Sequence, residues 1–160
     1  MRLFLPLIDE GVADMGRFIQ NGEQTVIDTE GRVMWTRTDS MIDLEKWVNY
    51  QDAADYAREL GENKFAGFDN WRLPTKDEMA TLYNETYSLK DKFEKEIHIC
   101  DCFASGCGFS MIAQIISGKM RTWILNLRTG EYDQPDGLWT LTEAARAVRT
   151  MGPDESIPGE

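Results

Sequence analysis

The stretch "DNWRLPTKDEMATLY", residues 69–83, combines a proline that stops an extended segment with the start of a helix. Pro74 disfavours helical backbone at the residue before it. Thr75 is followed three residues later by Glu78, which is the spacing of a capping box. Apolar side chains then recur at helical spacing, at Met79, Leu82 and Tyr83. The stretch therefore predicts an extended segment that turns directly into a helix over about 76–86.

The flanking segments predict one more helix and several short strands. Asn49 as a cap, an apolar stripe, and Gly61 as the C′ residue predict a helix over about 50–60. The strand-like runs lie at 25–28 and 33–35, within 109–116, at 122–127 and within 145–150. Strands, then two helices, then strands again indicate an α+β domain and not a βαβ alternation.

Three segments of the chain resemble the Lcl C-terminal domain family of bacterial proteins, also called DUF1566. They are residues 17–37 with "GRVMWTR", 47–83 with "DNWRLPT", and 122–150 with "ARAVRT". The "WRLPT" motif before a helix is also similar, more distantly, to formylglycine-generating enzymes. The resemblance implies a C-type-lectin-like domain over 17–150, with two helices, a twisted antiparallel sheet and long loops. An N-terminal lead-in at 1–16 and an acidic tail at 151–160 lie outside it.

Eight residues of these motifs are interpreted as structural. Tryptophans at strand or loop positions serve as large apolar anchors. The Arg72 guanidinium can hold a loop through charge-assisted hydrogen bonds. The set comprises Trp35, Trp71, Arg72, Leu73, Pro74, Thr75, Glu78 and Trp123.

Acidic side chains outnumber basic ones, 28 against 17, and give the chain a formal net charge of −11. Such a field repels nucleic acid and anionic membranes, and it attracts a basic protein surface. No run approaches the ~20 apolar residues that a membrane span needs. The apolar run in "MRLFLPLIDE" is too short for a signal peptide. We therefore expect a cytoplasmic protein with reduced cysteines, no membrane span and no nucleic-acid partner.

The window "HICDCFASGC", residues 98–107, holds the one histidine and all three cysteines of the chain. His98, Cys100, Cys102 and Cys107 are four ligands of the kind that zinc prefers. If "HICDC" is a strand, three of them share one face, and the strand must bend before they meet a single ion. Free cysteines are also common in cores. Three interpretations of this window stay open: a zinc site, a reactive thiol pair such as a Cys102–Cys107 disulfide, and a buried core strand. The buried core strand is favoured.

The distant similarity to formylglycine-generating enzymes implies another use of this window. Those enzymes bind copper through two cysteines that lie late in the chain near a "GGSW" motif. Here Cys102 and Cys107 lie in the middle of the chain, and the motif is absent. A nucleophile–base triad needs a base, and His98 is the only histidine. An enzyme is therefore the less favoured alternative, and no residue is assigned a catalytic role.

The loop "DQPDGLW", residues 133–139, supplies the candidate ligand-binding residues. Asp133, Gln134 and Asp136 offer the hard oxygen ligands that calcium prefers. Trp139 is a candidate exposed aromatic side chain. Calcium-dependent lectins pair a "QPD" tripeptide with a later "WND", which this chain lacks. The composition equally indicates a simple hairpin loop. We expect no cofactor, with zinc, copper and calcium as alternatives.

These observations favour a non-catalytic, lectin-like binding module that is an accessory or assembly subunit. We expect a protein partner or a homo-oligomer, with the binding surface at the loop-rich end. A carbohydrate-binding lectin is one alternative. The resemblance also implies sulfated polysaccharides, which the net charge of −11 opposes. A metal- or thiol-dependent protein built on 98–107 is the other alternative.

Overall fold

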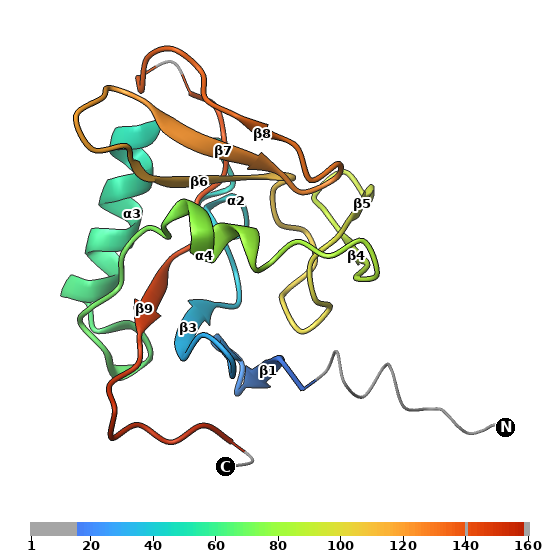
Figure 1. Cartoon of the computed structure of the whole chain (residues 1–160), viewed down its shortest axis with the longest axis vertical. Coiled ribbons are helices and arrows are strands. Elements are labelled where there is room, and N and C mark those ends of the chain that lie inside the picture. Colours follow the sequence, from blue (N-terminus) through green and yellow to red (C-terminus); the bar gives the residue numbers. More distant parts are fainter. Residues whose placement is uncertain (1–15, 140, 159–160) are drawn as a thin grey trace, which may run out of the picture.

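The computed structural model describes residues 16–139 and 141–158. One end of the molecule is a four-stranded antiparallel sheet in the order β1-β2-β3-β9 (Figure 1). Its strands are β1 (Phe18–Asn21), β2 (Thr25–Asp28), β3 (Val33–Thr36) and β9 (Val148–Thr150). Because β9 pairs with β3, the last strand returns beside the first hairpin. The expected strands at 25–28, 33–35 and within 145–150 are confirmed.

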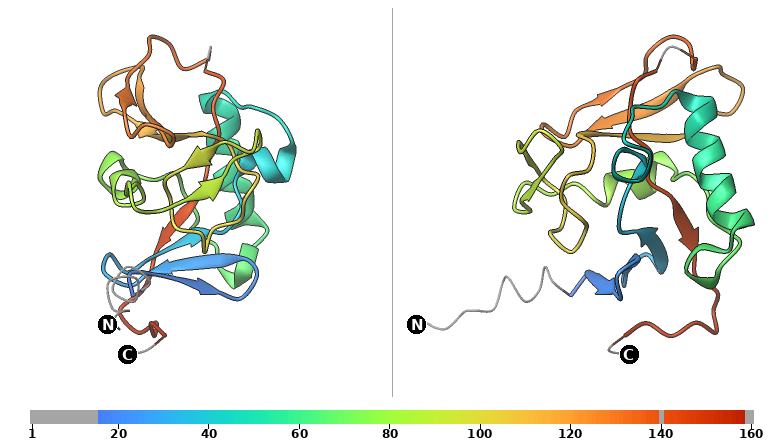
Figure 2. Two further views of the ribbon diagram at one scale, coloured as in Figure 1. Left: turned by 90° about the vertical axis from the view of Figure 1, so that its right-hand side faces the viewer. Right: turned by 180° about the vertical axis from the view of Figure 1, so that it is seen from behind.

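The opposite end is a three-stranded antiparallel sheet of β6 (Ser110–Ile115), β7 (Thr122–Asn126) and β8 (Tyr132–Asp133) (Figure 2). A separate hairpin joins β4 (Leu89–Lys90) and β5 (Glu96–Ile97). The resemblance implied one twisted antiparallel sheet, whereas the described residues form three separate sheets. The charged connector at residues 89–97 contains the β4–β5 hairpin. The connector closes into a hairpin because the buried Asp91 carboxylate accepts the N–H groups of Phe93 and Lys95, at 2.8 and 3.0 Å.

The described residues hold three α-helices and one 3-10 turn, where the sequence predicted two helices. They are α2 (Ser40–Leu44), α3 (Tyr50–Glu62), η2 (Phe65–Gly67) and α4 (Lys76–Ala80). Helix α3 confirms the prediction at its start, where the Asn49 side chain accepts the Asp52 N–H at 2.9 Å. Its end differs: Gly61 lies inside the helix and not at C′. A Cβ at Gly61 would lie 2.7 Å from the Asp69 carbonyl oxygen, so close packing explains the glycine.

Helix α4 begins as predicted but ends at Ala80, six residues earlier than expected. The capping box is present, with Thr75 and Glu78 each accepting the other's backbone N–H. The Thr81 hydroxyl then donates to the Glu78 carbonyl at 2.6 Å and competes with the helix ladder. The Asn84 N–H donates to the His98 carbonyl at 3.0 Å. Long-range pairing, which periodicity does not show, therefore replaces the last turns of the predicted helix.

The "WRLPT" segment joins helix α4 to strand β9, the last strand in the order of its sheet. Arg72 exchanges two backbone hydrogen bonds with Val148, at 2.9 and 2.8 Å. Its guanidinium forms a two-pronged ion pair with Glu78, with both distances 2.8 Å. The Trp71 indole N–H donates to the Phe65 carbonyl at 2.9 Å. Trp35, Trp71, Leu73 and Pro74 are buried, whereas Trp123 is half-buried. The motif thus contacts the turn at η2, helix α4 and strand β9.

Two clusters of buried side chains fill the molecule, and both larger sheets contribute to each. On β6 and β7, Met111 and Leu125 face one cluster, whereas Ile112 and Ile124 face the other. Both faces of these strands are therefore apolar along most of their length, as the continuous apolar run in "SMIAQI" indicates. The antiparallel sheets and separate helices confirm the α+β class.

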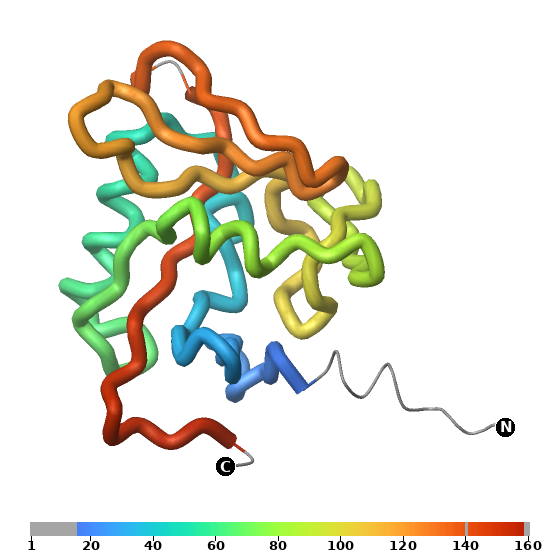
Figure 3. The backbone as a smooth tube through the Cα atoms, in the orientation of Figure 1, coloured from blue at the N-terminus to red at the C-terminus, as the bar shows by residue number. Residues whose placement is uncertain are grey.

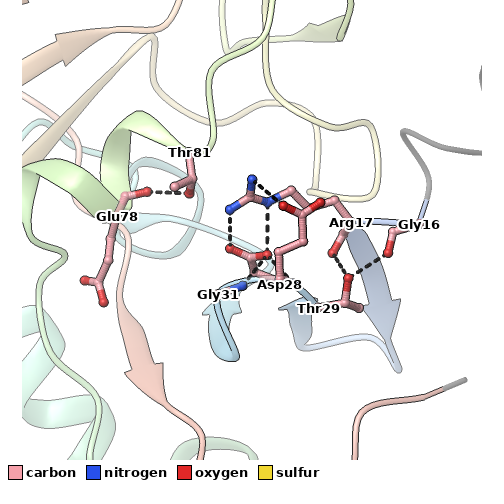
Figure 4. A network of polar contacts seen from close by, with 8 residues as sticks. Gly16, Arg17, Asp28, Thr29, Gly31, Glu78 and Thr81 are labelled. Atoms are coloured by element: carbon pink, nitrogen blue, oxygen red, sulfur yellow. Dashed lines mark hydrogen bonds and ion pairs between the residues drawn. The ribbon is translucent and has the colours of Figure 1, made fainter. Parts of the chain in front are cut away.

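The two ends of the described chain are held to the domain, one by an ion pair and the other by apolar packing. Asp28 is buried and accepts hydrogen bonds from Arg17 and from the backbone N–H groups of Glu30 and Gly31 (Figure 4). At the other end, Ile157 packs into one of the two clusters. Residues 1–15 of the predicted lead-in lie outside the described residues. No helix within the described residues is long and apolar enough to cross a membrane.

Candidate functional site

An open cleft of about 810 Å³ lies against one face of the β6-β7-β8 sheet. The strand register explains its composition. Ser110 pairs with Asn126, and Ile124 pairs with Asp133, so these four side chains share one face. Farther along the strands that face is apolar and buried, but at this end it carries polar side chains. The cleft is lined by Phe109, Ser110, Ile124, Asn126, Gly130, Glu131, Tyr132, Asp133 and Glu143.

Three carboxylates, from Glu131, Asp133 and Glu143, give the cleft its charge. Glu143 is positioned by two backbone hydrogen bonds to Val48, at 2.8 and 3.0 Å. Burial raises the pKa of the Glu143 carboxyl, the Ser110 hydroxyl opposes this by hydrogen bonding, and the charge of Asp133 adds to the increase. Within residues 16–139 and 141–158, no basic side chain forms an ion pair with any of the three. The cleft therefore favours a cationic group.

Aromatic side chains complete the walls of the cleft. Phe109 packs edge-on against Trp47, with ring centroids 5.1 Å apart, and the Arg128 guanidinium lies 4.2 Å from its ring centre. Arg128 is itself paired with the buried Asp91 at 2.8 Å. Tyr132 borders the cleft from β8, but its ring lies on the other face of the sheet and packs edge-on against Trp123, with centroids 6.2 Å apart. Ring packing and the Arg128–Asp91 ion pair hold the wall at Phe109 in place. None of the three cleft carboxylates takes part in that ion pair.

The four candidate ligand residues of the 133–139 loop do not lie together in one site. Asp133 lines the cleft. Gln134 lines a second hollow of about 530 Å³ with Lys119, Met120, Arg121 and Gly137. Asp136 forms an ion pair with Arg121. Trp139 is 57% exposed, so it is not buried in the core. The loop therefore does not present its three oxygen donors as one calcium site.

The cysteine window is a turn and not a strand, so the expected alternation along "HICDC" is wrong. Strand β5 ends at Ile97, and the Phe103 N–H donates to the Cys100 carbonyl at 3.1 Å. The reversal places both Ile99 and Phe103 in the core. Among the described residues, no three His, Cys, Asp or Glu side chains gather as a metal ligand set. His98 instead contacts the Tyr87 carbonyl through Nδ1 at 2.9 Å.

The three cysteines are free and differ in their surroundings. The Cys100 sulfur accepts the Cys102 backbone N–H at 3.3 Å. A hydrogen bond from the Cys102 thiol lowers the pKa of Cys100 against the effect of burial, and the same bond raises the pKa of Cys102. Burial raises the pKa of Cys107 to about 11. The neighbouring thiols are thus those of Cys100 and Cys102, and not Cys102 and Cys107 as the spacing suggested.

The sequence interpretation missed most of the cleft. Alternation in "FSMIAQII" and "TWILNL" places Ser110 and Asn126 at positions that face outward at a strand end, and this was the available signal. Glu143 carries no local signal, because its position depends on pairing with Val48, which is 95 residues earlier (143 − 48). Only Asp133 was both predicted as a ligand residue and found in the cleft.

Comparisons with known proteins give one finding on family. Searches of curated proteins and of solved structures found no match to this chain. The sequence profile of the Lcl C-terminal domain matches residues 24–149. Because this match covers well over half of the 160 residues, the chain belongs to the Lcl C-terminal domain family.

Proposed function

We propose that this protein is a C-type-lectin-like, non-catalytic binding module that acts as an accessory or assembly subunit. Its cleft on the β6-β7-β8 sheet receives a basic side chain of a protein partner. The observation that carries the proposal is that three carboxylates line the cleft and none of them forms an ion pair with a basic side chain of the described residues. A lysine or arginine of a partner supplies the missing charge and packs its apolar stem against Phe109.

Two further features support a protein ligand. The net charge of −11 attracts a basic surface from a distance and accelerates encounter with it. Met120 and Trp139 are exposed at 61% and 57%, on the loops that follow β6 and β8. Aromatic and methionine side chains are enriched where proteins bind one another.

The position of the single histidine supports a binding role over catalysis. Its ring packs edge-on against Tyr83, with centroids 5.7 Å apart, and Nδ1 is engaged by a backbone carbonyl. The cleft lining contains no histidine and no cysteine. The residues that line it offer charge, hydrogen bonds and apolar surface, which suffice for recognition.

Quantitative co-purification from the native source tests the proposal. The tagged wild-type chain is compared with Asp133→Asn/Glu143→Gln, which removes two cleft charges. Glu23→Gln/Glu85→Gln removes two charges from exposed positions outside the cleft and serves as the matched control. We expect the cleft variant to bind its partner at least about tenfold more weakly, which corresponds to about 1.4 kcal/mol, and the control to bind normally.

The alternatives give different results in the same experiment. Equal weakening of both variants indicates attraction by net charge alone and contradicts a specific cleft. A chain that binds no protein but retains sugars on a glycan array, with loss in the cleft variant, indicates the carbohydrate-binding lectin.

A further inference from the structure

The 98–107 segment lies beside the β4–β5 hairpin (Figure 3), and Cys100 and Cys102 lie in one turn of this segment. The Phe103 N–H closes the turn on the Cys100 carbonyl at 3.1 Å. Ile99 and Phe103, on either side of the pair, are 0% and 1% exposed and anchor the turn in the core. The Cys102 carbonyl also accepts a hydrogen bond from Arg37 Nε at 3.0 Å. Packing therefore holds the two cysteines next to each other.

Their sulfur atoms already interact. The Cys102 N–H donates to the Cys100 sulfur at 3.3 Å, and the Cys102 thiol donates to the same atom. Both hydrogen bonds favour the thiolate form of Cys100, which lowers its pKa although burial and Asp101 oppose the change. The thiolate is the nucleophilic form of cysteine. Cys102 is partly exposed and Cys100 is 7% exposed, so a small solute approaches the pair from the side of Cys102.

Cys107 provides the contrast within the same loop. Its side chain is fully buried, and burial raises its pKa to about 11. It contacts the hairpin through its backbone, which accepts the Lys92 N–H at 2.8 Å. A protonated, inaccessible thiol is inert.

From this geometry we propose that Cys100 and Cys102 form a peroxide-sensitive thiol pair that closes reversibly to a disulfide within the turn. This site is separate from the cleft and goes beyond the proposed function. The oxidant is a hydroperoxide of low molecular weight, and a dithiol reverses the change.

The chemistry balances over two steps. The Cys100 thiolate attacks one oxygen of the peroxide, the O–O bond breaks, and Cys100 becomes a sulfenic acid while hydroxide leaves. The Cys102 sulfur then attacks the Cys100 sulfur, the S–O bond breaks, and a second hydroxide leaves. The protons of the two thiols convert both hydroxides to water. Two electrons pass from the sulfurs to the peroxide, which yields one disulfide and two waters.

Mass spectrometry of the full-length chain tests this proposal. The protein is treated with hydrogen peroxide, denatured, alkylated with iodoacetamide and digested with chymotrypsin. Cleavage after Phe93 and Phe103 separates residues 94–103, with Cys100 and Cys102, from residues 104–109, with Cys107. We expect the 94–103 peptide to become about 2 Da lighter and to escape alkylation, while Cys107 is alkylated. Dithiothreitol should restore two alkylation sites.

Single variants separate the two steps. In Cys102→Ser, the Cys100 sulfenic acid should persist and react with dimedone. In Cys100→Ser, labelling of Cys102 should be at least about tenfold slower, because burial still raises the pKa of the Cys102 thiol after the Cys100 sulfur is removed. Cys107→Ser should still form the disulfide, and circular dichroism verifies that each variant is folded. Peptides joined between Cys102 and Cys107, full alkylation after peroxide, or equal labelling of both single variants would overturn the proposal.

Discussion

At the scale of single residues, two glutamates of this chain show how the surroundings of a carboxyl decide its effect on stability. Glu143 is partly buried without an ion pair, and burial raises its pKa. Glu155 accepts two hydrogen bonds from the guanidinium of Arg149, at 2.9 and 2.6 Å, and these lower its pKa. The charge of Glu143 therefore costs free energy in the folded state, whereas the charge of Glu155 stabilises it.

For Glu143→Gln we predict a melting temperature at pH 7 equal to or above that of the wild type. A carboxyl whose folded pKa is raised destabilises the fold when it is ionised, and this cost disappears as the pH falls below the unfolded value of about 4.3. The advantage of the variant should therefore shrink as the pH is lowered from 7 to 4, measured by thermal unfolding. Glu23→Gln, at an exposed position, is the control. A variant that is markedly less stable at pH 7 would contradict the assigned cost.

For Glu155→Gln we predict the opposite sign. Arg149 is only 3% exposed and loses its charged partner, which should lower the free energy of unfolding at pH 7 by about 2 kcal/mol. A lowered folded pKa gives stability that is present above the unfolded value of about 4.3 and is lost as the pH falls through the folded value. The difference from wild type should therefore narrow in acid. Asp154→Asn, exposed in the same tail, should leave urea unfolding unchanged.

At the scale of elements, helix starts were predictable and helix ends were not. A start depends on a local pattern, such as the Thr75–Glu78 capping box, which the sequence shows directly. The end of α4 depends on pairing between Asn84 and His98 and on the Thr81 hydroxyl. The 98–102 segment alternates like a strand in its sequence, yet the neighbours Ile99 and Cys100 are both buried, because the chain turns there. Local periodicity carries no information on these contacts.

For Thr75→Ala we predict a loss of about 1 kcal/mol of unfolding free energy, the usual contribution of an N-cap. The Thr75 hydroxyl accepts the Glu78 N–H at 3.1 Å, and the alanine leaves that group without its partner. Chemical denaturation measures the change. Thr142→Ala, at an exposed position outside any helix, should stay within about 0.5 kcal/mol of wild type. Equal effects of the two variants would show that the cap contributes nothing.

For Gly61→Ala, helix propensity and packing predict opposite signs. Propensity alone gives a gain of about 1 kcal/mol, because alanine is the better helix former. The new methyl group would lie 2.7 Å from the Asp69 carbonyl oxygen, and a clash with backbone costs roughly 1–3 kcal/mol. We expect the clash to dominate and the melting temperature to fall. A rise in melting temperature would show that the backbone at residues 69–71 moves away from the new methyl group without a loss of stability.

At the scale of the whole molecule, the described chain ends and the cleft lie at different sheets of the domain. The β1-β2-β3-β9 sheet holds both described chain ends through Asp28 and Ile157. The β6-β7-β8 sheet carries the cleft and the exposed loops. The sequence predicted the α+β class, the family and the acidic character, because these depend on composition and local motifs. It predicted one cleft residue, Asp133, since the others meet only when distant strands pair.

The central claim is that the cleft on the β6-β7-β8 sheet binds a basic side chain. Titration of the isotope-labelled full-length chain with a lysine-rich peptide, followed by amide chemical shifts, tests it most directly. We predict that the shifts of Ser110, Asn126, Asp133 and Glu143 move together, that Asp133→Asn/Glu143→Gln abolishes the movement, and that a glutamate-rich peptide causes none. Shifts that spread evenly over acidic positions such as Glu23 and Glu85, or that do not change at all, would contradict the claim.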